Sequence, residues 1–211
     1  MTITKAIRSA RTLGAAGAVA MLTFAFPVHA QEAPDAMVKR VSQDMIATIK
    51  SDPMIQAGNE ARIREVIEVK LIPHFDFMRM TSLAMGKNWR AATPEQQKRL
   101  ADEFKTLLVR TYSGALTKYR DETIDYKPLR MNPADTDVTV RTVVMKAGGQ
   151  PIQMDYSLTK AADGWQVFDV VIGGVSLVTN YHDEFNEQIK NGGVDGLVKT
   201  LSDRNKGVAA K

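Results

Sequence analysis

Residues 164–178 constrain the fold more than any other stretch, because they have the composition of a strand that is apolar on both faces. Along an extended chain the apolar side chains divide into two sets, with Trp165, Val167 and Val171 on one face and Phe168, Val170 and Ile172 on the other. Such a strand has to be covered on both sides. We therefore expect helices, or a bound ligand, to enclose the centre of a sheet.

A change of period at Glu122 predicts where this sheet begins. From there, strand-like patterns occupy four segments: Thr123–Met131, Asp137–Lys146, Pro151–Thr159 and Trp165–Ile172. The turn signals between them are Asn132-Pro133, Gly148-Gly149 and Asp163-Gly164. Because connections this short join antiparallel neighbours, the sequence predicts an antiparallel meander of about four to five strands.

Helical patterns precede and follow the strands. Three amphipathic segments come first: residues 36–50, a segment capped by Asn59 that ends before Pro73, and a short one between Asp76 and Gly86. Thr93-Pro94-Glu95-Gln96 has the pattern of a capping box, and the helix that it starts can run to about Tyr119. Two short helices, at about 179–190 and 195–202, follow the strands. Helices first and strands later is typical of the α+β class, with helices wrapped around the sheet.

The N-terminal segment has the features of a cleavable export signal. Lys5, Arg8 and Arg11 precede an apolar run from Leu13 to Phe26, which is too short to cross a bilayer. A small residue, Ala30, stands at the expected cleavage site. We therefore expect residues 1–30 to be removed on export to the periplasm.

The remaining chain is predicted to form one domain, residues 31–204, followed by a disordered tail, residues 205–211. The export signal holds three of the 28 basic residues and none of the 24 acidic ones. The mature chain is therefore almost neutral and lacks the basic surface of a nucleic-acid-binding protein. The chain has no cysteine, which excludes thiol catalysis and cysteine-bound metals.

Several blocks of residues occur in a characteristic order. They are Leu71-Ile72-Pro73-His74-Phe75-Asp76-Phe77; Met85-Gly86-Lys87-Asn88-Trp89 followed by Ala92-Thr93-Pro94-Glu95-Gln96; Leu107-Leu108 with Thr111-Tyr112 and Tyr119; and Trp165 through Tyr181. In these blocks the chain, from about Val41 to Ser202, resembles the MlaC or toluene-tolerance family of periplasmic phospholipid carriers, auxiliary proteins of an ABC transporter. One departure is Tyr181-His182, since the family usually has Tyr-Arg there.

The resemblance implies a sheet of the nuclear-transport-factor-like kind with a deep apolar pocket between sheet and helices. It further implies a soluble periplasmic carrier with no enzymatic activity and no cofactor, whose cargo is a glycerophospholipid. The partners would be an outer-membrane lipoprotein complex and an inner-membrane ABC transporter with a lipid-binding ring subunit. Such transport would maintain the lipid asymmetry of the outer membrane. Some relatives are associated with hopanoids, so a hopanoid or another lipid is an alternative cargo.

Apolar residues of the predicted helices and strands are the candidate walls of this pocket. The expected lipid-binding residues are Leu83, Met85, Trp89, Leu108, Tyr112, Leu116, Met154, Tyr156, Val170, Ile172, Val175 and Leu177. Each of them could instead belong to an ordinary core. Lys87, Arg90 and Lys118 are candidates for the head-group end or for partner surfaces.

Two alternatives from other classes stay open. A small exported enzyme could use His74, Asp76 and His182 as a metal site of two histidines and one carboxylate, or Asp169 as a carboxyl with a shifted pKa. Asp76 also occupies an N-cap position. The segment around Ser176 begins like a nucleophile elbow, with Gly174 two residues before the serine, but it lacks the second glycine of that motif. The other alternative is a structural adaptor whose interior is filled by side chains. A cavity between sheet and helices would separate the carrier from the adaptor.

Overall fold

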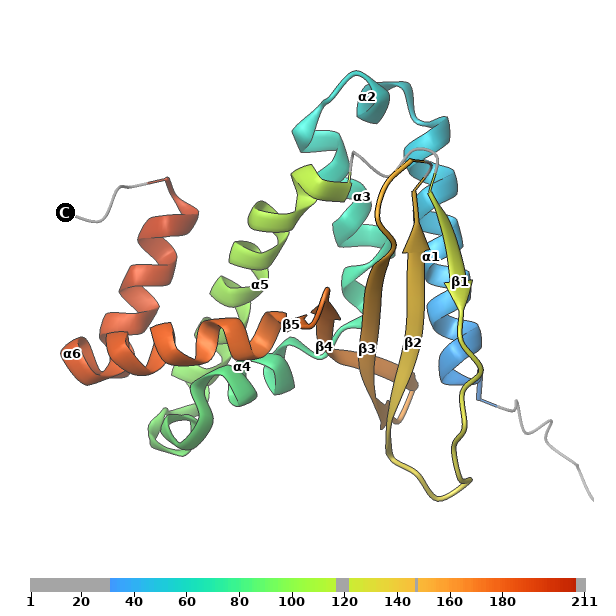
Figure 1. The fold of residues 1–211 in the computed structure, drawn as a ribbon. Helices are drawn as coiled ribbons and strands as arrows, with labels where there is room; N and C mark the ends of the chain where they lie inside the picture. The colour runs from blue at the N-terminus through green and yellow to red at the C-terminus, as the bar shows by residue number, and fades with distance from the viewer. Residues whose placement is uncertain (1–30, 117–121, 147, 208–211) are drawn as a thin grey trace, which may run out of the picture. The chain divides into compact units, whose positions relative to one another are not determined.

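The computed structural model describes residues 31–116, 122–146 and 148–207, all within one unit, Gln31–Lys211 (Figure 1). The predicted export signal, Lys118, Tyr119 and residues 208–211 of the predicted tail lie outside the described residues. The elements, in which η denotes a 3₁₀ helix, are α1 (Pro34–Ser51), α2 (Pro53–Gln56), α3 (Glu60–Lys70), η1 (Ile72–His74), α4 (Phe77–Met85), η2 (Gly86–Ala91), α5 (Pro94–Leu116), β1 (Thr123–Tyr126), β2 (Asp137–Met145), β3 (Ile152–Ala161), β4 (Gly164–Ile172), β5 (Val175–Ser176) and α6 (Leu177–Asn205).

The strands form the predicted antiparallel meander. Their order in the sheet is β1-β2-β3-β4-β5, and every neighbouring pair is antiparallel. β1 ends at Tyr126, five residues before its predicted end at Met131, and β5 adds a short edge strand that the sequence pattern did not predict. The α+β class with an antiparallel sheet of about four to five strands is confirmed.

One expectation about β4 is wrong, because a β-bulge interrupts its alternation. Asp169 pairs with Ser157 but Val167 pairs with Leu158, so Phe168 is the extra residue on its strand. The bulge shifts the face of every later side chain by one position. All four apolar residues, Trp165, Val167, Val170 and Ile172, therefore lie on one face of the sheet. On β3 their respective cross-strand partners on the same face are Lys160, Leu158, Tyr156 and Met154. Phe168 instead lies under the guanidinium of Arg79, 3.7 Å from its ring centroid.

The predicted helix starts are confirmed by their hydrogen bonds. The side chain of Asn59 accepts from the backbone of Arg62 at 3.0 Å, and Asp76 accepts from Arg79 at 2.9 Å. In the capping box, the Thr93 N–H donates to Gln96 Oε1 at 2.9 Å and the Gln96 N–H donates to Thr93 Oγ1 at 3.3 Å. These local patterns therefore place α3, α4 and α5.

The two predicted C-terminal helices are the two halves of α6. Gly193 has a φ of 66°, which interrupts the helical backbone and bends α6, as Figure 1 shows. Asn205 belongs to α6 and donates its side-chain amide to the backbone carbonyl of Glu103 at 2.9 Å, so the first residue of the predicted tail packs on α5. α2 was not predicted, although Asp52 caps it and Pro53 starts it.

The buried apolar residues that the structure describes form three separate clusters. The C-terminal cluster joins α4, α5 and α6 around Met80, Phe104, Phe185, Leu197 and Leu201. The sheet cluster joins α1 to the sheet through Met37, Val41, Val140, Leu158 and Val170. The N-terminal cluster joins α1, α2, α3 and α5 through Met45, Ile49, Ile55, Ile63 and Val109. A domain usually has one contiguous core, so the space between these clusters is the place to look for a site. No helix among the described residues is long and apolar enough to cross a membrane.

Candidate functional site

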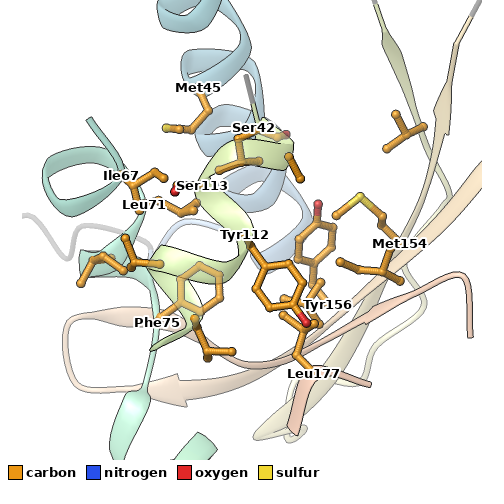
Figure 2. A pocket seen from close by; sticks show the side chains of 18 of the residues that line it. Ser42, Met45, Ile67, Leu71, Phe75, Tyr112, Ser113, Met154, Tyr156 and Leu177 are labelled. Atoms are coloured by element: carbon orange, nitrogen blue, oxygen red, sulfur yellow. The ribbon is translucent and has the colours of Figure 1, made fainter. Parts of the chain in front are cut away.

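A pocket of about 220 Å³ lies where the three clusters meet (Figure 2). One wall is the apolar face of the sheet. The register places the six sheet residues of the lining on that one face: Ile124, Val144, Met154, Tyr156, Val170 and Ile172. The bulge in β4 is what brings Val170 and Ile172 to the same face as Trp165 and Val167. A sheet with one apolar face therefore supplies a continuous wall.

Helices supply the opposite walls. From α1 come Ser42, Met45, Ile46 and Ile49, whose i, i+3, i+4, i+7 spacing places them on one side of the helix. From α5 come Leu108, Val109, Tyr112, Ser113, Ala115 and Leu116. Figure 2 shows Tyr112, Met154 and Leu177 pointing into the same space from α5, β3 and α6, and Met45 of α1 pointing toward Ile67 and Leu71.

The segment from α3 to α4 closes the pocket. Its contribution is Ile67, Leu71, Ile72, Phe75, Phe77 and Met80. A parallel bridge between Phe75 and Val167 ties this segment to β4, and the Asp76 N–H donates to the Val167 carbonyl at 2.9 Å. The rings of Phe75 and Phe77 stack with centroids 5.8 Å apart. The turn before α4 is thus fixed against the sheet rather than free to fill the pocket.

The lining is almost entirely apolar. No described lining residue is charged, and the polar side chains of the lining are the hydroxyls of Ser42, Tyr112, Ser113 and Tyr156. The Ser42 hydroxyl donates to the Val38 carbonyl at 2.6 Å and contacts the Tyr126 hydroxyl at 2.7 Å. A cavity of this composition favours hydrocarbon and offers nothing to compensate a buried charge.

Eight of the predicted wall residues line the pocket. They are Leu108, Tyr112, Leu116, Met154, Tyr156, Val170, Ile172 and Leu177. The structure places the other four elsewhere. Met85 is fully buried in the C-terminal cluster and Trp89 packs against it, while Leu83 and Val175 are exposed to 44% and 56%. Met80 lies on the side of α4 that faces the pocket. Because successive residues of a helix point in different directions, Leu83 and Met85 lie on other sides of α4.

Sequence reasoning missed the contribution of α1, α3 and the start of α4 to the pocket. Residues 36–50 were predicted to form an amphipathic helix, but its apolar side, which includes Met45 and Ile49, does not show from sequence whether it meets side chains or a cavity. Lys87 and Arg90 lie exposed on η2 and do not line the pocket, and Lys118 is outside the described residues.

The residues proposed for catalysis have structural roles instead. Asp169 accepts from the Ser176 hydroxyl at 2.7 Å and from the Val178 N–H at 3.2 Å. Ser176 in turn accepts from the Thr179 N–H at 2.9 Å as the N-cap of α6. These contacts hold the junction of β5 and α6, where Leu177 enters the pocket wall.

The proposed metal site does not assemble. Asp76 is the N-cap of α4, and a ring nitrogen of His182 contacts the Ala84 carbonyl at 3.1 Å. Burial lowers the pKa of His74, and the nearby Arg40 lowers it further. Within the described residues no group of three histidine, aspartate or glutamate side chains could hold a metal ion.

Comparisons with known proteins agree with this geometry. The sequence profile of the MlaC protein family matches residues 39–203. The toluene tolerance protein ttg2D of Pseudomonas putida is 25% identical over 184 residues, 86% of this chain and 85% of its own length. The intermembrane phospholipid transport system binding protein MlaC of Haemophilus influenzae is 20% identical over 175 residues, 82% of each chain.

A solved structure gives the same fold. The phospholipid-binding protein of Ralstonia solanacearum, determined at 1.53 Å in complex with a phospholipid, superimposes with a TM-score of 0.77 and 44% sequence identity, over 83% of this chain and 98% of that one. Since the family profile covers most of the chain, from the middle of α1 to the end of α6, the chain belongs to the MlaC family.

Proposed function

We propose that this chain is a phospholipid carrier of an intermembrane transport system, and that the pocket between the sheet and α1, α3 and α5 holds the acyl chains of its cargo. The observation that carries the proposal is an apolar cavity at the meeting point of three core clusters, with no charged residue in its described lining. The R. solanacearum relative, at 44% identity, binds a phospholipid, and the H. influenzae relative is named for phospholipid transport.

The charge-free lining determines which part of the cargo is buried. A phosphate group inside this pocket would lose its hydration and find only four hydroxyl side chains. The acyl chains therefore occupy the pocket and the charged head group stays at the surface. The protein acts by binding and releasing, not by catalysis, since its candidate catalytic residues cap helices and hold loops.

The energetics suit a carrier better than a storage protein. Transfer of about 30 methylenes from water, at about 0.8 kcal/mol each, is worth roughly 24 kcal/mol. That exceeds the practical limit of non-covalent affinity, about 18–21 kcal/mol. A carrier exchanges its cargo with membranes or partner pockets in which the chains are already dry, so the net free energy of each transfer is small.

The pocket has to widen when it takes up cargo. Its volume of about 220 Å³ is below the range of about 300–1,000 Å³ typical of small-molecule sites. Met45, Met80 and Met154 line three different walls, and unbranched methionine side chains adapt to a new shape more readily than branched ones. The three walls belong to separate clusters, which allows them to move apart without breaking a single packed core.

The proposed setting is the periplasm. Residues 1–30 would direct export and be cleaved near Gln31. The partners would be an outer-membrane lipoprotein complex and an inner-membrane ABC transporter with a lipid-binding ring subunit, between which cargo exchange maintains outer-membrane lipid asymmetry. The name of the H. influenzae relative, an intermembrane transport protein, supports such an assembly.

Lipid content and lipid uptake test the proposal. Native mass spectrometry of protein purified without detergent should show bound phospholipid, and the protein should extract fluorescent phospholipid from vesicles. Met154→Lys should abolish uptake, whereas Gln153→Lys on the opposite face of β3 should retain it, since neighbouring strand residues face opposite ways. A folded Met154→Lys protein that takes up lipid as well as the Gln153→Lys control would contradict the assignment of the pocket.

A further inference from the structure

A second concave site lies outside the lipid pocket, between η2 and the first half of α6. It is lined by Lys87, Asn88, His182, Asn186, Ile189 and Lys190. His182, Asn186 and Lys190 are spaced four residues apart and so share one side of α6, which faces η2. This set, which we call the basic groove, contains two lysines and no carboxylate.

The lysines of the basic groove form no ion pair with any residue that the structure describes. Over residues 31–116, 122–146 and 148–207, neither Lys87 nor Lys190 has a carboxylate oxygen within 4.0 Å of its ammonium group. In the same helix Lys199 pairs with Asp203, and on α5 Lys98 pairs with Asp102 at 2.7 Å. Within the described residues other exposed lysines, such as Lys50 and Lys160, also form no ion pair. What distinguishes Lys87 and Lys190 is that both line one concave site whose described lining holds no carboxylate.

The floor of the basic groove is held in place before any partner arrives. The Asn88 amide donates to Asn186 Oδ1 at 2.5 Å, which links η2 to α6. Because the Ala84 carbonyl can only accept, Nδ1 of His182 is the donor in their 3.1 Å contact. Gly86, with a φ of 55°, allows this approach, since a Cβ there would lie 2.8 Å from His182 Cε1. A site ordered in advance binds at a lower entropic cost.

We propose that the basic groove docks an acidic segment of a partner protein. Lys87 and Lys190 would pair with aspartate or glutamate side chains, while Asn88 and Asn186, each with donors and an acceptor, suit the backbone of an extended peptide. Ile189 adds an apolar contact at the edge.

An anionic membrane surface fits the basic groove less well than a peptide does. Recognition of anionic lipid surfaces takes clusters of about four to eight basic residues, and the groove lining has two lysines. Asp183 and Glu187 are exposed on α6 directly beside the row formed by His182, Asn186 and Lys190, and they would repel a flat anionic surface. A narrow peptide can approach the lysines without lying over these carboxylates.

The basic groove and the lipid pocket share two helices. α4 carries Met80 in the pocket wall and the Ala84 carbonyl at the groove, while α6 carries Leu177 in the wall and His182 at the groove. Five residues of helix correspond to a rise of about 7.5 Å. A protein docked in the groove would thus lie close to the lipid pocket. That the docked protein belongs to the transport system rests on the proposed function, whereas the preference for an acidic segment does not.

Binding of a fluorescein-labelled hexaglutamate peptide, followed by fluorescence anisotropy, tests the proposal on the mature chain with its bound lipid. The peptide should bind at about 10 mM salt and much more weakly at about 0.15 M, because the screening length falls from about 30 to about 8 Å. Lys87→Glu with Lys190→Glu should weaken binding by about tenfold or more. The matched control is Lys50→Glu with Lys160→Glu, which makes the same change in net charge at two exposed lysines outside the groove and should alter binding by less than about twofold.

Equal weakening in both double variants, or none in the Lys87 and Lys190 variant, would overturn the proposal, since binding would then follow net charge or another surface. Native mass spectrometry of the same samples keeps this outcome separate from the proposed function. Lipid content should be the same in the wild type and in both double variants, because neither pair lines the lipid pocket. Absence of lipid from all three proteins would count against the carrier function and not against the groove.

Discussion

Leu177→Asp places a carboxylate in the wall of the lipid pocket at a position where the fold can tolerate it. Leu177 lines the pocket and is the first residue of α6, directly after the N-cap Ser176. Aspartate is favourable in the first turn of a helix, where it is worth about 0.3–1 kcal/mol. Loss of a half-buried leucine costs about 1 kcal/mol. The two effects nearly cancel, so we expect a folded protein whose stability changes by less than about 1 kcal/mol.

The effect on lipid binding should be much larger than the effect on stability. A carboxylate keeps its hydration, so the water around it occupies space that acyl chain would otherwise fill. Exclusion of about three methylenes, at about 0.8 kcal/mol each, weakens binding by about 2.4 kcal/mol, or roughly 60-fold. Thr179→Asp is the matched control, because Thr179 is exposed in the same helical turn and does not line the pocket.

Transfer of fluorescent phospholipid from vesicles measures the difference, and circular dichroism with thermal melting checks the fold of both variants. Leu177→Asp should show uptake near the detection limit, and Thr179→Asp should match the wild type. If the two folded variants take up lipid equally well, the charge is not in the path of the acyl chains and the pocket has been placed wrongly.

Three further variants test the stability of the fold. Gly86→Ala should lower the stability by about 2 kcal/mol and the Tm by about 4–8 °C, because Gly86 has a positive φ and lies close to His182. Its control is Gly114→Ala, at an exposed helical position with open space for a Cβ, which should raise the stability by up to about 1 kcal/mol. The Arg79 guanidinium donates two hydrogen bonds to Asp137 and lowers the pKa of that carboxyl. The contribution of this ion pair to the stability of the fold is therefore present above the pKa of the unfolded state, about 3.9, and is lost as the pH falls through the lower pKa of the folded state. In denaturant titrations Asp137→Asn should therefore cost up to about 1 kcal/mol at neutral pH and less below about pH 4, and an equal cost at both pH values would refute the ion pair.

The sequence predicted best what depends on neighbouring residues. Asn59, Asp76 and Thr93 cap helices as their patterns indicated, because a cap requires only a side-chain oxygen within three residues of the N–H that it accepts from. The antiparallel meander was also predicted correctly, because short connections between strands are a local feature of the sequence. Gly86 was likewise predicted, from its residue type alone, to end the helix before it. In the structure it follows the last residue of α4 and has a positive φ.

The errors arose where the position of a side chain depends on a contact with a residue distant in the sequence. Phe168 looked like part of an ordinary alternation, and only its pairing with β3 shows that it is an extra residue. The expected division of the apolar residues between the two faces of β4 was therefore wrong. The conclusion that the sheet needs covering holds, because one face carries the sheet cluster and the pocket wall, and Phe168 packs against the C-terminal cluster. Met85 and Trp89 were assigned to the pocket because they are apolar, and their actual neighbours are on α5 and α6.

The pocket itself arises from the way α5 divides its apolar surface. Phe104 and Leu108 on one stripe pack toward α4 and α6, while Val109 and Leu116 on the next stripe pack toward α1 and α3. At 3.6 residues per turn Tyr112 lies between the two stripes, and its side chain points into the pocket (Figure 2). A sequence pattern shows only that this broad face is apolar, and an ordinary core would satisfy that pattern equally well. The two helix layers pack on opposite edges of α5, and between those edges Tyr112 borders the pocket without filling it, which leaves that space to the hydrocarbon chains of a guest.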